Sequence, residues 1–234
     1  MAITKQAVRY DVGGKSHESL GVWDDAVSGK RPVVLVTPTF MGRSAFEEEK
    51  AEKLVALGYA ALVVDIFGID VKPANFEEAG AAMQAVNGDR AGLATMMQAA
   101  LDAALGLEVA DAGKVAAIGF CFGGKCVLDL VRQGADLKGA ITFHGIFDQP
   151  GIPVAEAIPA RVLALHGWDD PLATPEDVIA FAAEMTGKKA DWQLHAYGHT
   201  VHGFTNYNRP DMFEEKAARR SWQAMENFLG EVFA

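Results

Sequence analysis

Three side chains that can perform nucleophilic catalysis occur in three separate motifs of this 234-residue chain. Cys121 lies within GFCFGG, Asp170 within HGWDDP and His202 within HTVHGFTN. A thiolate can attack an acyl carbon, a histidine can carry the proton, and an aspartate can orient the histidine ring. The three residue types, taken in this order, therefore predict hydrolysis through a covalent intermediate.

Cys121 stands where an apolar, β-rich run ends and a helical pattern begins. We predict a strand over residues 114–118 and a helix over 125–132, so the chain must turn sharply between them. Glycines on both sides of the cysteine permit such a turn, and the helix N-terminus favours a thiolate. The pattern G-x-C-x-G is that of a nucleophile elbow with cysteine in place of serine. The plain alternative is a buried structural cysteine in a glycine-rich turn.

A second alternative is a phosphate-binding loop, because residues 119–126 match G-x-x-x-x-G-K followed by cysteine. A P-loop nucleotide-binding protein has serine or threonine at that last position, where the hydroxyl binds Mg²⁺. The thiol of Cys126 is a poor ligand for this hard ion, and two phenylalanines crowd the backbone amides of the loop. A phosphate loop would also leave the later aspartate and histidine motifs without a role, so the elbow is preferred.

The acid of the triad has two adjacent candidates. We prefer Asp170, because it ends the turn before Pro171 and its carboxylate can reach over the sheet edge; Asp169 is the alternative. His199 and His202 are three residues apart and could suggest a metal pair. The spacing lies in a loop and no third ligand is near in the sequence, so we predict no metal.

Stabilisation of an oxyanion requires two preorganised donors. We predict that these are the backbone N–H of Phe122, directly after the nucleophile, and that of Phe40, in the loop after the first buried strand. The phenylalanines indicate an apolar acyl pocket, although aromatic residues near strand ends more often belong to the core. The candidate pocket residues are Thr39, Phe67, Trp168, Phe204, His144 and Asn206.

The elements that must position these residues alternate between strand and helix. Strands are predicted over residues 3–10, 15–23, 33–36, 60–64, 114–118, 139–143, 161–165 and 191–196. Helices are predicted over residues 45–57, 76–86, 91–105, 125–132, 175–185 and 211–228. The first two strands should form an antiparallel hairpin, and the others predict an α/β fold with a mostly parallel sheet and helices on both faces. Such sheets place active residues at the carboxyl ends of their strands, where all three motifs fall.

Composition indicates one domain over residues 1–234, because half of the residues are hydrophobic and the length suits a single core. The formal net charge of −10, without a cluster of lysine or arginine, argues against nucleic acid as a partner. No apolar run suits a membrane helix or a secretory signal, so we expect a cytoplasmic protein without a membrane partner. Cys121 and Cys126 fit neither a disulfide nor a structural zinc site.

The three motifs, in this order, resemble those of the dienelactone hydrolase family of α/β hydrolases, also called carboxymethylenebutenolidases. The sequence DIFG at residues 65–68 is similar to another strand-end motif of the family. The resemblance spans nearly the whole chain. It implies an α/β-hydrolase fold and a cysteine-based hydrolase of lactones or small esters that needs no metal or organic cofactor. The protein would act on a small-molecule substrate as a monomer or homodimer.

Three positions depart from the family pattern. A glutamate that helps activate the thiol in the family corresponds here to Thr39, and two arginines that bind a substrate carboxylate would fall near Ile69 and at Asn206. We therefore expect a preference for neutral, apolar esters or lactones, with a side activity on activated phosphate triesters. A protein of another class, a non-catalytic ligand-binding protein on the same scaffold, is the alternative.

Overall fold

The computed structural model describes residues 2–234, which form eight strands and six helices. Their contacts divide the chain into two compact units, Met1–Ala117 and Ile118–Ala234. The expectation of a single domain over residues 1–234 stays a prediction. Within residues 2–234, no helix combines the length and the apolar character needed to cross a bilayer.

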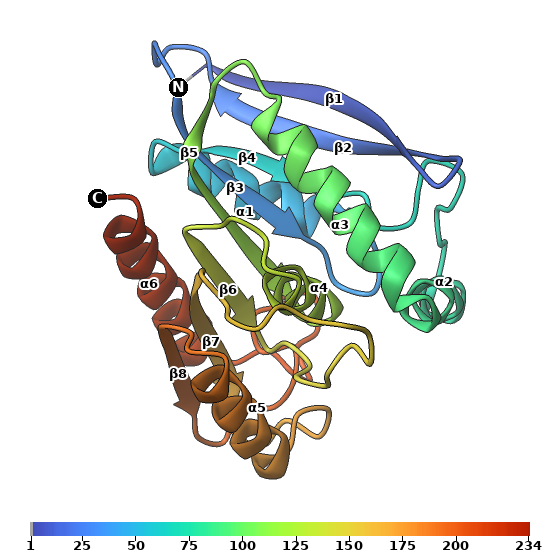
Figure 1. Ribbon diagram of the computed structural model, residues 1–234, viewed down its shortest axis with the longest axis vertical. Coiled ribbons are helices and arrows are strands. Elements are labelled where there is room, and N and C mark those ends of the chain that lie inside the picture. The colour runs from blue at the N-terminus through green and yellow to red at the C-terminus, as the bar shows by residue number, and fades with distance from the viewer. Residues whose placement is uncertain (1) are drawn as a thin grey trace. The chain divides into compact units, whose positions relative to one another are not determined.

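The first unit begins with an antiparallel hairpin. Strands β1 (Ile3–Val12) and β2 (Lys15–Asp24) pair along their whole length, so the predicted hairpin is confirmed. Gly13 and Gly14 form its two-residue turn with φ values of 56° and 80°, which glycine adopts without steric cost. Figure 1 shows this long hairpin in blue at one edge of the unit.

The buried strands of the first unit are β3 (Arg31–Thr37) and β4 (Ala60–Val63), which pair in parallel. The spatial order is β1-β2-β4-β3, followed by β5 (Ala110–Phe120), whose last residues belong to the second unit. Helix α3 (Arg90–Leu105) covers one face of these strands and α1 (Ala45–Ala56) covers the other (Figure 1). Helix α2 (Phe76–Gly88) contacts α3 and buries only Ala79.

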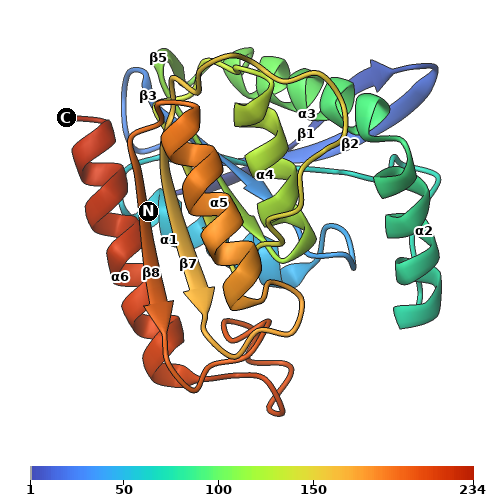
Figure 2. The ribbon, with the colours of Figure 1, turned by 60° about the horizontal axis from the view of Figure 1, so that its bottom comes forward.

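The second unit contains three parallel strands that follow the end of β5. They are β6 (Gly139–Phe143), β7 (Arg161–Gly167) and β8 (Trp192–Tyr197), in that spatial order. Helix α4 (Phe122–Arg132) packs on β6, and Figure 2 shows α5 (Pro175–Gly187) and α6 (Glu215–Val232) on opposite sides of β7 and β8. The predicted alternation is confirmed, and parallel pairing brings the carboxyl ends of β6, β7 and β8 to one edge.

Several predicted boundaries are wrong. Strand β5 starts four residues before the predicted 114, and α4 starts directly after Cys121, at Phe122, instead of at Lys125. The last helix begins at Glu215 instead of residue 211, because the carboxylate of Glu214 caps it by accepting from the N–H of Ala217 at 2.6 Å. Short turns and caps decide such boundaries, and hydrophobic periodicity does not report them.

Candidate active site

Cys121 forms a sharp turn between β5 and α4. Its backbone lies at φ 55° and ψ −117°, a left-handed conformation that a residue with a side chain rarely adopts. It is the N-cap residue of α4, yet its side chain makes no capping hydrogen bond, and the side chain is half-buried. The thiol is therefore held at a helix N-terminus without being engaged by that helix, as a nucleophile requires.

Two glycines near Cys121 are required because neighbouring atoms of the chain lie too close for a side chain. A Cβ atom added at Gly119 would overlap the carbonyl oxygen of Gly123, and one added at Gly124 would overlap the hydroxyl of Thr142 and lie 2.9 Å from Cα of Gly145. Both glycines have ordinary φ values, so steric space determines these two positions. The turn and the first turn of α4 can pack against the end of β6 only because side chains are absent there.

His202 forms a buried hydrogen bond with Asp170. Its Nδ1 atom lies 2.8 Å from Oδ2 of Asp170, and the two residues are only 5% and 2% exposed. The other carboxylate oxygen of Asp170 accepts from the N–H of Leu172 at 2.8 Å, which fixes the carboxylate plane. Asp169 is exposed to solvent, and its N–H donates to the carbonyl of Thr200 at 3.0 Å. The structure therefore joins Asp170, and not Asp169, to the histidine.

The charge of His202 follows from its partners. Burial opposes the charged ring, but the interactions with Asp170 and with the Cys121 thiol outweigh burial and raise the pKa of His202 to about 10. Its Nε2 atom is buried and makes no hydrogen bond of ordinary geometry, although the thiol is close enough to contribute to that shift. The raised pKa favours the charged form of the ring near neutral pH.

His144, at the end of β6, contacts the backbone of Cys121, the predicted nucleophile. Its Nδ1 atom accepts a hydrogen bond from the N–H of Cys121 at 3.1 Å, and its Nε2 atom lies 2.8 Å from the hydroxyl of Thr205. The ring stands edge-on to those of His202 and Phe204, each with centroids 5.2 Å away. The side chain predicted to line the pocket is thus 2% exposed and bonded at both nitrogens.

The other predicted residues of the second unit differ in exposure. Trp168 is 44% exposed, whereas Phe204 is fully buried between His144 and Tyr197. Asn206 is half-buried, and its side-chain oxygen accepts from the N–H of Asn208 at 3.0 Å. Phe204 is therefore part of the core, while Trp168 alone of these three presents a large apolar surface.

Thr39, Phe40 and Phe67 lie in the first unit, and their predicted roles toward Cys121 stay predictions. The N–H of Thr39 donates to the buried carboxylate of Glu47 at 3.2 Å, and the ring of Phe40 stacks on Phe76 with centroids 6.0 Å apart. Phe67 is buried, and its N–H donates to the carboxylate of Asp65 at 3.1 Å. The loop after β3 is thus held by side chains of its own unit.

Sequence reasoning missed two residues of these networks, Glu47 and Thr205. Glu47 accepts from the N–H groups of both Thr39 and Ser44, and no motif in the sequence links it to Thr39. Thr205 lies inside the histidine motif, which was the available signal, and it bonds His144. His166 is fully buried beside Phe147, and neither of its ring nitrogens has a hydrogen-bond partner within the described part of the chain.

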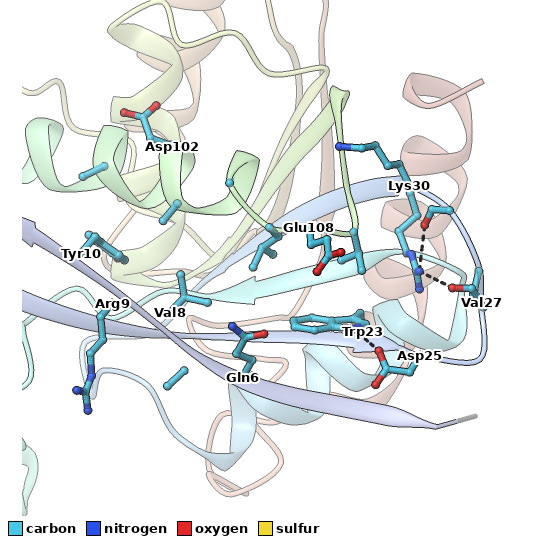
Figure 3. A pocket seen from close by; sticks show the side chains of 18 residues that line it. Gln6, Val8, Arg9, Tyr10, Trp23, Asp25, Val27, Lys30, Asp102 and Glu108 are labelled. Carbon is cyan, nitrogen blue, oxygen red and sulfur yellow. Dashed lines mark hydrogen bonds between the residues drawn. The ribbon is translucent and has the colours of Figure 1, made fainter.

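One groove of the first unit contains none of the predicted residues. It has a volume of about 1000 Å³ and lies between the β1–β2 hairpin and α3. Figure 3 shows the ring of Trp23 across its middle, with Gln6 on one side and Glu108 on the other. The indole N–H donates to Asp25 at 2.6 Å. The groove has no histidine or cysteine among its lining residues. Among residues 2–234, no cluster of three or more potential ligands could hold a metal ion.

Known proteins with this architecture include a dienelactone hydrolase-like promiscuous phosphotriesterase from metagenomic libraries. Its crystal structure matches with a TM-score of 0.93 and 38% identity, over 100% of both chains. An uncharacterized protein of Caenorhabditis elegans is 33% identical over 155 residues, which are 62% of this chain and 98% of that protein. A putative carboxymethylenebutenolidase of Salmonella typhimurium is 25% identical over 211 residues, covering 86% of this chain and 77% of that protein.

The fold and its solved neighbours define an α/β hydrolase with a mostly parallel sheet and an antiparallel N-terminal hairpin. The sequence profile of the dienelactone hydrolase family matches residues 21–233. The chain belongs to the dienelactone hydrolase family, so the resemblance found in its three motifs is confirmed.

Proposed function

We propose that the protein is a cysteine hydrolase of small esters or lactones. Cys121 is the nucleophile, His202 carries the proton, and Asp170 orients the ring. The observation that carries this proposal is the buried 2.8 Å hydrogen bond of His202 to Asp170, with the Cys121 thiol near enough to raise the pKa of the ring. An ion pair of thiolate and imidazolium is the reactive form of cysteine hydrolases.

The reaction consists of two acyl transfers. The thiolate of Cys121 attacks the acyl carbon, and the resulting oxyanion accepts a hydrogen bond from the N–H of Phe122, which has no partner in the first turn of its helix. His202 donates its proton to the alkoxide as the C–O bond breaks, leaving a thioester. Water then loses a proton to His202 and attacks the thioester, and the acid is released with Cys121 as thiolate. A lactone gives the hydroxy acid by the same steps.

The proposed substrates are neutral and apolar. The resemblance to the family places a carboxylate-binding arginine near Ile69 and another at Asn206, and this chain has neither. With a formal net charge of −10, the protein has no evident means of attracting an anionic lactone. The exposed ring of Trp168 suits an uncharged acyl or alcohol group.

A side activity on phosphate triesters is proposed for the same site. The structural neighbour that is 38% identical over the whole chain is a promiscuous phosphotriesterase. A triester is neutral and can carry a good leaving group, so the thiolate of Cys121 can displace that group from phosphorus. Water must then cleave the resulting S–P bond, with His202 as the base.

The setting of the enzyme is proposed from composition and family membership. The acidic chain, its two reduced cysteines and its family support a cytoplasmic enzyme that acts without a cofactor, nucleic acid or membrane, as a single domain and a monomer or homodimer. Gel filtration with light scattering distinguishes the two assembly states.

The test is a panel of neutral aryl esters, neutral lactones, carboxylated counterparts and one activated phosphate triester. We expect the neutral carboxylic esters to have the highest kcat/KM. Cys121→Ala and His202→Ala should each lower kcat by a factor of about 10³ or more. Faster turnover of an anionic dienelactone than of the neutral esters would overturn the substrate preference. A folded protein that is inert toward every ester, with Cys121 unreactive to iodoacetamide, would indicate the ligand-binding alternative.

A further inference from the structure

His144 occupies a constrained position between the nucleophile and the histidine loop. Its backbone has a φ of 40°, outside the usual range for a residue with a side chain, and its N–H donates to the carbonyl of Leu165 at 2.8 Å. The side chain is 2% exposed, so it offers almost no surface to a substrate. Strain and burial together indicate a side chain that the fold holds in one place for a purpose other than lining a pocket.

The two hydrogen bonds of the ring determine its tautomer. The backbone N–H of Cys121 can only donate, so Nδ1 of His144, 3.1 Å away, must carry a lone pair. The proton of the neutral ring is then on Nε2, which donates to the hydroxyl of Thr205 at 2.8 Å. A ring protonated on both nitrogens would turn a donor toward the N–H of Cys121 and lose that hydrogen bond.

The surroundings of His144 favour this neutral form. Burial lowers the pKa of His144 well below its usual value, and the neighbouring charge of His202 lowers it further. The rings of the two histidines are 5.2 Å apart, so only one of them can carry a positive charge at little cost. With His202 as the imidazolium, His144 serves as a neutral acceptor and donor.

The contacts of His144 join two segments that are far apart in the sequence. The N–H of Cys121 is shared between Nδ1 of His144 and the carbonyl of Phe143, at 3.1 and 3.0 Å, so the end of β6 holds the turn. Thr205 is three residues after His202 in the same loop, and it is 6% exposed. The loop is thus tied on one side by Asp170 to His202 and on the other by His144 to Thr205.

We propose that His144 is a positioning residue that ties the backbone of Cys121 to the loop of His202 through Thr205, as a neutral ring with its proton on Nε2. The inference rests on the proposed function for its effect on catalysis, but the tie itself is a property of the folded protein. It assigns to His144 a role different from pocket lining. Thr205 becomes part of the machinery that keeps thiol and imidazolium in reacting geometry.

Thr205 offers the cleaner test, because valine has nearly the shape of threonine but no hydroxyl. Thr205→Val should lower kcat for a neutral aryl ester about tenfold with KM unchanged, since a buried donor on His144 loses its acceptor. Thr205→Ser should regain most of the lost kcat, because the hydroxyl returns. Equal activities of the valine and serine variants would overturn the proposal.

His144→Asn and His144→Ala separate the two ends of the tie. The asparagine oxygen lies near the position of Nδ1 and can still accept from Cys121, whereas alanine retains neither bond. We expect kcat to fall in both variants and further in His144→Ala, with KM unchanged. A rise in KM at constant kcat in either variant would show that His144 lines the pocket, and would overturn the proposal. Circular dichroism and urea unfolding identify any His144 variant that fails to fold. If one fails to fold, the kcat of Thr205→Val still tests the proposal.

A readout independent of hydrolysis completes the test. ¹⁵N NMR of the histidine rings in the native protein should show His144 as a neutral Nε2–H tautomer across the pH range in which His202 is charged, and the two Thr205 variants should differ in this signal. A proton on Nδ1 of His144, or a charged ring at neutral pH, would overturn the proposal. If the NMR result is as expected but no ester is hydrolysed by the native protein, the proposed function fails while the tie stands.

Discussion

Two junctions between a strand and a helix, one in each unit, differ in how the N-terminus of the helix is held. After β3, Ser44 is the N-cap residue of α1; it has extended backbone (φ −145°, ψ 177°) and caps the helix by accepting from the N–H of Phe46 at 3.2 Å. Glu47 completes the capping box by accepting from the N–H of Ser44 at 3.0 Å. After β5, Cys121 is the N-cap residue of α4, with φ 55° and no side-chain cap.

The difference shows what a reactive side chain requires. In the first junction the polar side chains are occupied by the helix, which stabilises it and leaves nothing to react. In the second the side chain stays free, and the strained turn is held by partners outside the helix, through the carbonyl of Phe143, the ring of His144 and the close packing of Gly124 on β6. Stability at the elbow therefore depends on tertiary contacts, whereas at α1 it is local.

The largest expected effect comes from removing the charge that holds His202 next to the free thiol. Asp170→Asn should lower kcat by a factor of about 10⁴, because an amide disfavours the required tautomer and does not stabilise the imidazolium. The pKa of His202 should fall from about 10 toward its ordinary value. Steady-state kinetics and NMR titration measure the two effects. Asp169→Asn is the matched control, and an equal loss in that variant would reverse the assignment of the acid.

The second expected effect tests the close packing of the elbow. Gly124→Ala should lower the free energy of unfolding by about 1–3 kcal/mol, because the added methyl would overlap the hydroxyl of Thr142 near Gly145. Gly230→Ala, in α6, has open space at the same atom and should raise stability by about 0.5–1 kcal/mol. Urea denaturation measures both. Similar values for the two variants would mean that the elbow is not tightly packed.

The third prediction concerns the dependence of stability on pH. Because the folded pKa of His202 is raised to about 10, its contribution to stability is fully present below its unfolded pKa of about 6.5 and is lost as pH rises through 10. Between these pH values the folded state binds one more proton than the unfolded state. The contribution of His202 to the free energy of unfolding therefore falls by up to about 1.4 kcal/mol per pH unit. The difference between native protein and His202→Asn, measured by urea denaturation from pH 7 to 10, isolates this share. A difference independent of pH would contradict the raised pKa.

The smallest expected effect concerns the helix cap at the junction after β3. Ser44→Ala removes a helix cap and should lower the free energy of unfolding by about 1 kcal/mol. Cys121→Ala removes no cap, and its effect on stability should be smaller than that of Ser44→Ala despite the loss of activity. Chemical denaturation of the two variants gives the comparison. A larger destabilisation by Cys121→Ala would show that the thiol contributes to holding its own helix.

Much of the local structure was predictable from sequence. The capping box of Ser44 and Glu47, the hairpin turn and the buried strands depend on neighbours a few residues away, and the structure contains all of them. The starts of α4 and of the last helix were wrong, because the N-cap residues Cys121 and Glu214 determine them and periodicity does not detect caps. The predicted part played by Phe40 at the oxyanion stays a prediction.

The sequence by itself determined which chemistry we predict for this protein, because a cysteine between glycines, an aspartate turn and a histidine loop are local patterns with local physical causes. Only the tertiary structure decided how the residues meet. The bonds of His144 to Cys121 and Thr205 and that of Asp170 to His202 span 23, 61 and 32 residues. Contacts over such separations form only when parallel strands bring their carboxyl ends together, and no local periodicity records them. The sequence therefore presented His144 as one more residue at a strand end, and only the folded protein shows it holding the nucleophile.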